Sequence, residues 1–257
     1  MVLLEVAIAI SVVFTKMKFC IKIADLTVGI SCTHELTRRM CAEYLVDEAV
    51  SPLIFAEASE TDKEKLRKYF LGFSEVFSDD YIESCAIFDK ICTQVIAFDA
   101  AVFHAALISL DGNGIAFAAP SGTGKTTHIK LWKKIFAERV EIVNGDKPLF
   151  TLREERFFAS GMPWCGKESW NVNKTVPLKK ICFIERAEKN KIVPLTDSRD
   201  IMSRLFNQLI LPADNPDLLI KYLSFANNLI NTVPFYLLSC DMSEDAALVA
   251  YNGMFGE

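Results

Sequence analysis

Residues 115–132, with the sequence IAFAAPSGTGKTTHIKLW, combine residue types that can hold a polyphosphate. Counted from Ala119, residues 124–126 (GKT) match the phosphate-loop pattern G-x-x-x-x-G-K-[ST], except that alanine replaces the first glycine. Glycines let successive backbone N–H groups converge on one anion, and the N-terminus of a following helix adds its positive dipole. In such a loop Lys125 reaches the terminal phosphates, and the hydroxyl of Thr126 ligates magnesium.

The pattern therefore predicts a Walker A site for ATP and Mg²⁺, with nucleotide contacts from Ser121, Gly122, Thr123, Gly124, Lys125, Thr126 and Thr127. The alternative is an ordinary strand-to-helix turn that contains Gly-Lys-Thr by coincidence. Ala119 conflicts with the pattern only if its position requires a positive φ, which a Cβ disfavours.

Phosphoryl transfer also needs a metal ligand opposite the loop and a group that orients the nucleophile. Asp146 ends the apolar run EIVNGD and could ligate Mg²⁺ as a Walker-B-like carboxylate, or it could only cap a turn. His104 lies in the apolar stretch AAVFHAALISL, which returns the chain to the phosphate loop. It could be a catalytic group or a hydrogen-bonded core residue. The predicted catalytic residues are thus Asp146, His104 and Lys125.

The segment GMPWCGKESWNVN (residues 161–173) combines glycines, a proline and two tryptophans in a polar loop. Trp164 and Lys167 could close over the phosphate acceptor, with the lysine offsetting phosphate charge. The alternative is that Trp164 plugs the end of the sheet. Cys165 is not expected to be a nucleophile, because phosphoryl transfer needs no thiol. Lys147 and Arg186 are weaker candidates for the site.

Hydrophobic periodicity predicts the elements that must position these residues. An apolar strand precedes the loop over 115–118, after a DGNG turn, and apolar residues at helical spacing begin a helix near Gly124. Strands and helices alternate from there to the C-terminus, with a hairpin over 149–160 and strands near 179–186, 191–195 and 235–240. Two helices separate the last two of these strands, and a short helix ends the chain. The pattern predicts an α/β fold with a mixed sheet flanked by helices.

The first third of the chain is read as a separate α/β subdomain over residues 1–97, packed on a nucleotide-binding core over 98–257. It contains extended segments near 18–32 and 52–59, and a helix over 61–73 capped by Thr61. A longer amphipathic helix over 79–98 places Tyr81, Cys85, Phe88, Cys92 and Val95 on one face. That stripe favours core packing over a cofactor site.

Composition limits the function classes. With 257 residues, 51% hydrophobic, the chain can bury a core, and its net charge of −5 gives no general attraction to nucleic acid or anionic membrane. Eight scattered cysteines without a C-x-x-C pair favour reduced thiols in the cytoplasm and give no support for a zinc site. The apolar start, residues 1–14, is interrupted by Glu5 and is read as a strand, or as an extension upstream of Met17, not as a membrane span.

The residues FHAALISLDGNGIAFAAPSGTGKTTHIKLW, IVNGDKPLF and GMPWCGK together resemble the HPr kinase/phosphorylase and PEP-carboxykinase-like P-loop superfamily. Within it, the chain is most similar to small bacterial HPr-kinase-like proteins of uncertain substrate. The resemblance implies that His104 matches a histidine on the hairpin before the phosphate loop. It also implies that Asp146 is the second member of an aspartate pair, whose first position holds Gly145.

The resemblance implies a PEP-carboxykinase-like P-loop fold and an ATP- and Mg²⁺-dependent kinase. The acceptor is expected to be a hydroxyl on a small molecule or on a serine-bearing protein or peptide. The C-terminal features of true HPr kinases and the additional arginine and metal positions of PEP carboxykinases are not matched. A catalytically weak nucleotide-binding regulatory module and a PEP-carboxykinase-like phosphoryl-transfer enzyme therefore stay open as alternatives. Assembly as a homo-oligomer also stays open.

Overall fold

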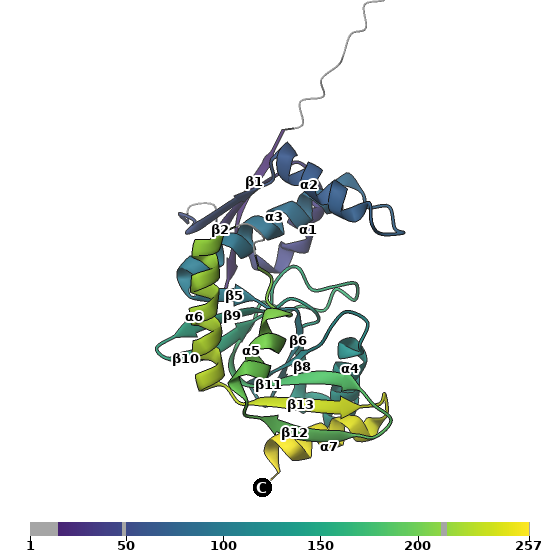
Figure 1. Cartoon of the computed structure of the whole chain (residues 1–257). Coiled ribbons are helices and arrows are strands. Elements are labelled where there is room, and N and C mark those ends of the chain that lie inside the picture. The colour runs from purple at the N-terminus through teal and green to yellow at the C-terminus, as the bar shows by residue number, and fades with distance from the viewer. Residues whose placement is uncertain (1–14, 48–49, 212–214, 257) are drawn as a thin grey trace, which may run out of the picture.

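A four-stranded sheet with three helices forms the upper lobe of the computed structural model, which describes residues 15–47, 50–211 and 215–256 (Figure 1). Its elements are β1 (Met17–Ile23), β2 (Leu26–Cys32), α1 (Glu35–Met40), β3 (Leu45–Val46), β4 (Ile54–Glu57), α2 (Glu60–Phe70) and α3 (Asp79–Val95). The strand order is β3-β1-β2-β4, with β2 and β4 parallel and the other neighbours antiparallel. All of β2 is buried, and it is one of the two inner strands of this sheet.

A larger, nine-stranded mixed sheet forms the lower lobe. Its strands are β5 (Ala100–Val102), β6 (Ala105–Leu110), β7 (Asn113–Ala118), β8 (Val140–Asn144), β9 (Leu149–Arg153), β10 (Arg156–Ser160), β11 (Thr175–Arg186), β12 (Lys191–Leu195) and β13 (Phe235–Cys240). Seven of them follow the order β5-β9-β10-β11-β7-β6-β8, and β13 joins β11 to β12. Strand β7, which leads into the glycine loop, lies between β6 and a parallel β11. The predicted mixed α/β fold is confirmed at this level.

Helices cover both faces of the larger sheet. They are α4 (Lys125–Phe136), α5 (Ser198–Phe206), α6 (Pro216–Thr232) and α7 (Glu244–Phe255). The side chains of β7 alternate between two separate hydrophobic clusters: Ala116 packs with α5 and α6, whereas Ile115 and Phe117 pack with α4 and α7. This alternation follows from the two-residue period of a strand. The strand before the glycine loop is therefore buried on both faces.

The two lobes share hydrophobic packing. A third cluster joins Ile87 and Ile91 of α3 to Val102, Leu149 and Trp164, and thus crosses the boundary expected near residue 98. The Tyr222 hydroxyl, on α6, also donates to the carbonyl oxygen of Cys92 on α3 at 2.9 Å. The upper lobe is therefore fixed to the lower one by packing and by hydrogen bonds.

Several local predictions need correction. The stretch around His104 is two strands, β5 and β6, because β5 pairs with β9 whereas β6 pairs with β7 and β8. Helix α2 begins one residue before Thr61, since Ser59 is its N-cap in a capping box with Asp62. On α3, Tyr81 is 41% exposed, so the expected stripe does not face the core as a whole.

Other expectations agree with the structure or lie outside it. The DGNG turn is confirmed: Asp111 and Gly112 have φ of 48° and 83°, as a two-residue turn between antiparallel strands requires. All eight cysteines are free thiols. Residues 1–14 lie outside the described residues, so the expectation for them is not addressed. Within the described ranges, no helix combines the length and the apolar character that crossing a bilayer requires.

Candidate active site

The glycine loop connects the end of β7 to the start of α4, at the edge of the sheet where the parallel strands β7 and β11 both end. Gly122 and Gly124 have φ of +76° and +127°, which residues with a Cβ rarely adopt. Ala119 is buried and is not among the described residues with a positive φ, so the alanine fits its position. The loop therefore has the backbone that a phosphate cradle needs, with Gly124 as the N-cap of α4.

Lys125, the first residue of α4, turns its side chain back beneath the loop. It is 7% exposed, and its ammonium group donates to the carbonyl oxygen of Ala119 at 2.8 Å. Its Nζ also lies 3.0 Å from Nε2 of His104. Burial lowers the pKa of Lys125 to about 8, although the negative charge of Asp146 opposes this shift. A bound phosphate would compensate a partly desolvated cation of this kind.

The break between β5 and β6 places the side chain of His104 next to both Lys125 and Asp146. The backbone N–H of His104 donates to the carbonyl oxygen of Gln208 at 2.7 Å, and that of Ala105 donates to the carbonyl oxygen of Asp146 at 3.0 Å. Nε2 of His104 lies 3.2 Å from Oδ1 of Asp146. Nε2 can accept from Lys125 or donate to Asp146, but one ring nitrogen cannot do both at once. Nε2 of His104 can therefore make either the hydrogen bond with Lys125 or the one with Asp146.

The turn after β8 fixes Asp146. The side-chain oxygen of Asn144, a fully buried residue, accepts from the backbone N–H groups of Asp146 at 2.9 Å and Lys147 at 2.7 Å. The Asn144 amide in turn donates to the carbonyl oxygen of Met162 at 3.0 Å. Burial alone would raise the pKa of Asp146, but the contacts with His104 and the Lys147 ammonium outweigh it and hold this pKa well below its usual range. Asp146 is thus a fixed, ionised carboxylate.

Gly145, which precedes Asp146 in the turn after β8, has no room for a side chain. Its N–H donates to the carbonyl oxygen of Trp170 at 2.8 Å. A Cβ built on it would lie 2.9 Å from the carbonyl oxygen of Cys165, closer than real Cβ contacts come. The loop over 161–173 therefore closes this position to any acidic residue.

Arg186, at the end of β11, holds the outside of the glycine loop. Its guanidinium donates to the carbonyl oxygens of Gly122 at 2.5 Å and Thr123 at 3.1 Å. A recess of about 270 Å³ lies beside this contact, lined by Gly124, Thr127 and Leu131 among others. From the sequence, Arg186 is only a weak candidate, because a single arginine at a strand end carries no local signal.

The two residues predicted to contact an acceptor lie in different surroundings. Trp164 is 6% exposed, its indole N–H donates to Ser84 Oγ at 3.1 Å, and its ring packs on Phe88 with centroids 5.2 Å apart. This burial favours the packing alternative for Trp164. Lys167 is exposed, and its ammonium lies 3.4 Å from a carboxylate oxygen of Glu75.

The oxygen ligands near the loop suit a metal that nucleotide phosphates help to hold. Thr126 lies in the first turn of α4, and Asp146 supplies the single carboxylate of the cluster described above. No group of three or more His, Cys, Asp or Glu side chains within the described ranges is arranged to hold a metal ion. Mg²⁺ commonly binds through one or two carboxylates together with phosphate oxygens, so this donor set fits it.

The structure thus brings Lys125, His104 and Asp146 into one contact group behind the glycine loop, and it leaves Trp164 apart from them. Sequence reasoning missed Asn144. Its signal is the N-G-D order, because an asparagine side chain often accepts from the backbone two residues later. Lys147 was a weak candidate, and its ion pair with Asp146 adds it to the group.

Comparison with known proteins gives one family. A family model described as "SynChlorMet cassette protein ScmC" matches residues 81–245, more than half of the chain. Among solved structures, that of the Hpr(Ser) kinase/phosphatase from Coxiella burnetii matches with a TM-score of 0.27 and 16% sequence identity, over 50% of this chain and 90% of that chain. A TM-score of this size does not show a common fold. None of the curated proteins matches.

Proposed function

Since the chain belongs to the family of SynChlorMet cassette protein ScmC, we propose from its own site that it is an ATP- and Mg²⁺-dependent phosphotransferase that acts on a hydroxyl group. We propose further that the fold is of the PEP-carboxykinase-like P-loop type, as the sequence resemblance implies. One observation carries the functional proposal: Lys125, His104 and Asp146 are in contact directly behind a glycine loop that opens a helix. A histidine that served only core packing would not require contacts with both a lysine ammonium and a carboxylate.

The backbone N–H groups of the glycine loop and the ammonium of Lys125 would bind the β- and γ-phosphates. Arg186 supports the loop from outside, so its shape exists before the nucleotide binds. Thr126 and Asp146 would hold Mg²⁺, which offsets phosphate charge when bound. The low pKa of Asp146 keeps this carboxylate ionised throughout the physiological pH range.

The two exclusive hydrogen bonds of His104 suggest how the nucleotide prepares the site. Without a phosphate, the ammonium of Lys125 is close enough to donate to the lone pair on Nε2 of His104. A bound γ-phosphate would draw the ammonium away and free this lone pair. The acceptor oxygen then bonds to the γ-phosphorus as the bond from that phosphorus to the bridging oxygen breaks, which leaves ADP. The hydroxyl proton passes to Nε2, and the new N–H donates to the carboxylate of Asp146.

A second candidate function is a regulatory module that binds ATP and transfers nothing. The observation that favours it is Gly145, which leaves Asp146 without a neighbouring carboxylate. Slow ATP hydrolysis does not separate the two functions, since a binding module can hydrolyse ATP slowly. Phosphate appearing on an acceptor separates them.

The experiment compares His104→Gln and Lys125→Ala with wild-type protein. Calorimetry measures ATP affinity, and a screen of peptides and metabolites with labelled ATP, followed by single-turnover kinetics, measures transfer. Lys125→Ala should weaken ATP binding about tenfold or more, because a charge-assisted contact contributes about 1.5–3 kcal/mol. His104→Gln should keep ATP affinity and lose about 10²–10⁴-fold in transfer.

Lys134→Ala is the matched control, because Lys134 lies on the same helix but pairs with Glu244 away from the loop. Equal ATP affinity in wild-type protein and Lys125→Ala would contradict the nucleotide site. A His104→Gln protein that melts early but transfers phosphate at the wild-type rate would make His104 a structural residue.

A further inference from the structure

A cluster of five aromatic rings protrudes from the upper lobe beside the candidate site. It comprises Tyr69, Phe70, Phe73, Phe77 and Tyr81, and we call residues 69–81 the aromatic hairpin. Phe70 stacks on Phe77 with centroids 4.2 Å apart, and Phe77 stacks on Tyr81 at 5.3 Å. None of these rings belongs to the buried clusters of the described structure.

The hairpin leaves a large apolar surface in solvent. Tyr69 is 65% exposed, Phe73 is 51% exposed, and Val76 is fully exposed. Among the residues of α2, none is buried, although Leu66, Tyr69 and Phe70 recur at helical spacing. An amphipathic helix gains most of its stability from packing its apolar face. Helix α3 covers part of the apolar face of α2, where Phe70 lies against Tyr81, and leaves Tyr69 in solvent. Contiguous exposed apolar patches of this kind mark interaction sites.

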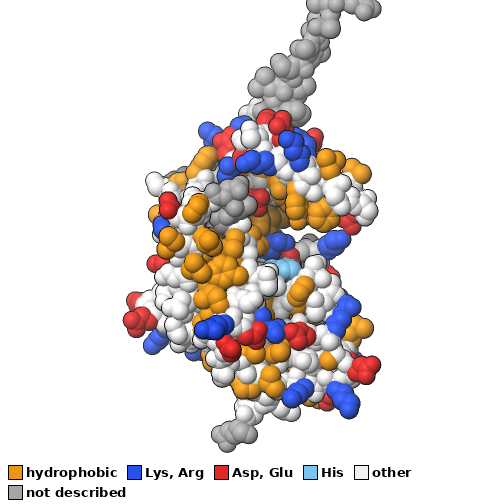
Figure 2. Space-filling model, viewed as in Figure 1, with side chains coloured by type: hydrophobic (Ala, Val, Ile, Leu, Met, Phe, Trp, Pro, Cys, Tyr) orange, Lys and Arg blue, Asp and Glu red, His pale blue; other side chains and the backbone are white. Residues whose placement is uncertain are grey.

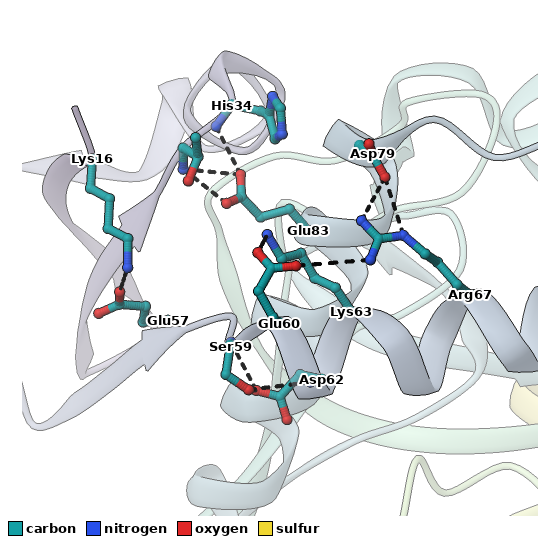
Figure 3. A network of polar contacts seen from close by, with 11 residues as sticks. Lys16, His34, Glu57, Ser59, Glu60, Asp62, Lys63, Arg67, Asp79 and Glu83 are labelled. Carbon is teal, nitrogen blue, oxygen red and sulfur yellow. Dashed lines mark hydrogen bonds and ion pairs between the residues drawn. The ribbon is translucent and has the colours of Figure 1, made fainter. Parts of the chain in front are cut away.

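Polar contacts hold the hairpin in a defined position (Figure 3). Arg67, near the end of α2, donates to Asp79 at the start of α3 through two nitrogens, at 2.8 and 3.3 Å. The buried carboxylate of Glu83, on α3, accepts from the backbone N–H groups of Thr33 at 2.9 Å and His34 at 2.8 Å. The cluster is thus a preformed surface, which lowers the entropic cost of binding a partner.

The hairpin is also continuous with the candidate active site. Figure 2 shows a hollow between the lobes, with hydrophobic side chains on its upper wall and a histidine and basic side chains within it. The tip of the hairpin reaches the 161–173 loop through Glu75 and Lys167.

We propose that the aromatic hairpin binds the phosphate acceptor, and that the acceptor is a polypeptide segment in which an aromatic or aliphatic side chain lies close to the reacting serine or threonine. The transfer step rests on the proposed function, with the seryl or threonyl oxygen as the oxygen that attacks. The apolar side chain packs on the hairpin, and the neighbouring hydroxyl enters the hollow in front of Asp146 and His104.

The shape and charge of the aromatic hairpin favour a polypeptide ligand over a small molecule or a negatively charged membrane. Small molecules bind in concave sites that bury most of their surface, whereas Phe73 and Val76, at the tip of the hairpin, are half and fully exposed. Aromatic residues dominate the binding energy of protein interfaces. A negatively charged membrane is disfavoured, because the chain carries a net charge of −5 and Glu75, Asp79 and Asp80 lie within the hairpin.

The test uses the full chain and fluorescent peptides with a central serine, flanked either by phenylalanine and leucine or by alanine and lysine. Anisotropy measures binding without nucleotide, and mass spectrometry with ATP measures transfer. Phe73→Ser should weaken binding of the apolar peptides at least tenfold and raise KM for transfer, while ATP affinity stays unchanged. Ile220→Ser, at a 67% exposed position on α6, should change neither and is the matched control. Val76→Asp, at a fully exposed position, should act like Phe73→Ser if the latter folds poorly.

The two measurements keep this proposal and the proposed function separate. If apolar peptides bind through Phe73 but are never phosphorylated, the proposed kinase function is refuted, while peptide binding by the aromatic hairpin is supported. The surface is refuted if no peptide of the set binds, if alanine and lysine peptides bind equally well, or if both hairpin variants bind as wild-type protein does. It is also refuted if light scattering shows that Phe73→Ser dissociates a dimer without changing peptide affinity, or if the variants lose only binding to phosphatidylcholine vesicles.

Discussion

Acidification should destabilise this protein through His128, which lies one turn behind the glycine loop on α4. Its ring is 3% exposed, and its Nε2 accepts from the indole N–H of Trp132 at 2.9 Å. The proton of the neutral ring is therefore on Nδ1, which has no hydrogen-bond partner within the described part of the chain. Burial lowers the pKa of His128 to about 4, so the folded protein keeps this ring neutral.

The sign and size of the effect follow from linkage. Below about pH 6.5 the unfolded chain protonates this histidine, whereas the folded protein does so only near pH 4, so the unfolded state binds more protons between these values. The stability of the folded state therefore falls as the pH falls through this interval. At pH 5 the loss is about 2 kcal/mol, since about 1.5 pH units separate this pH from the unfolded pKa.

Urea unfolding of wild-type protein and His128→Gln at pH 7.5 and pH 5.0 measures this loss. Glutamine can still accept from Trp132 but does not titrate. Comparing the pH dependence of the two proteins cancels other groups, such as Asp89, whose pKa burial raises to about 6. The wild-type protein should lose about 2 kcal/mol more than the variant on acidification. Equal losses, or an NMR titration of His128 near pH 6.5, would refute the reasoning.

Two further substitutions test the close backbone packing at Gly145 and the support that Arg186 gives to the glycine loop. Gly145→Ala should reduce the free energy of unfolding by about 1–3 kcal/mol, because the new Cβ would meet a backbone carbonyl oxygen at 2.9 Å. Gly72→Ala, whose Cβ would meet one atom at an ordinary 3.7 Å, is its control, and equal stability of the two variants in chemical denaturation would contradict this close approach. Arg186→Ala removes the donors to Gly122 and Thr123 and should weaken ATP binding about tenfold by calorimetry with little change in Tm. Unchanged affinity would show that the loop holds its shape without Arg186.

The parts of the site that depend on local sequence could be predicted. The start of α4 at Lys125 follows from a buried strand, two glycines and helical periodicity, all within eighteen residues. The turn at Asp111 and Gly112 follows from the preference of these residue types for positive φ. Ser59 could also have been identified as the N-cap of α2, since serine followed by aspartate at the third position resembles a capping box.

The parts that depend on distant segments could not be predicted. His104 follows a break between two strands, and that break exists because β5 pairs with β9, about fifty residues later in the chain. The sequence around Trp164 is typical of an exposed loop, but its indole N–H donates to Ser84, eighty residues earlier in the chain. Tyr81 shares a helical stripe with Phe88, yet Phe88 packs on Trp164 and is buried, whereas Tyr81 is 41% exposed. Periodicity defines a helix face and does not define what covers it.

Strand β11 has a consequence for how the lower lobe unfolds. Over its twelve residues it pairs first with β10, near Pro177, and later with β7 and β13. It ends at Arg186, which donates to the glycine loop. The part of the larger sheet that contains β10 and the part that contains β7 and β13 therefore both depend on pairing with β11. Neither part can unfold by itself without disturbing the strand that the other part pairs with. We expect the nine-stranded sheet to unfold as one cooperative unit, and the glycine loop to lose its shape in that same transition.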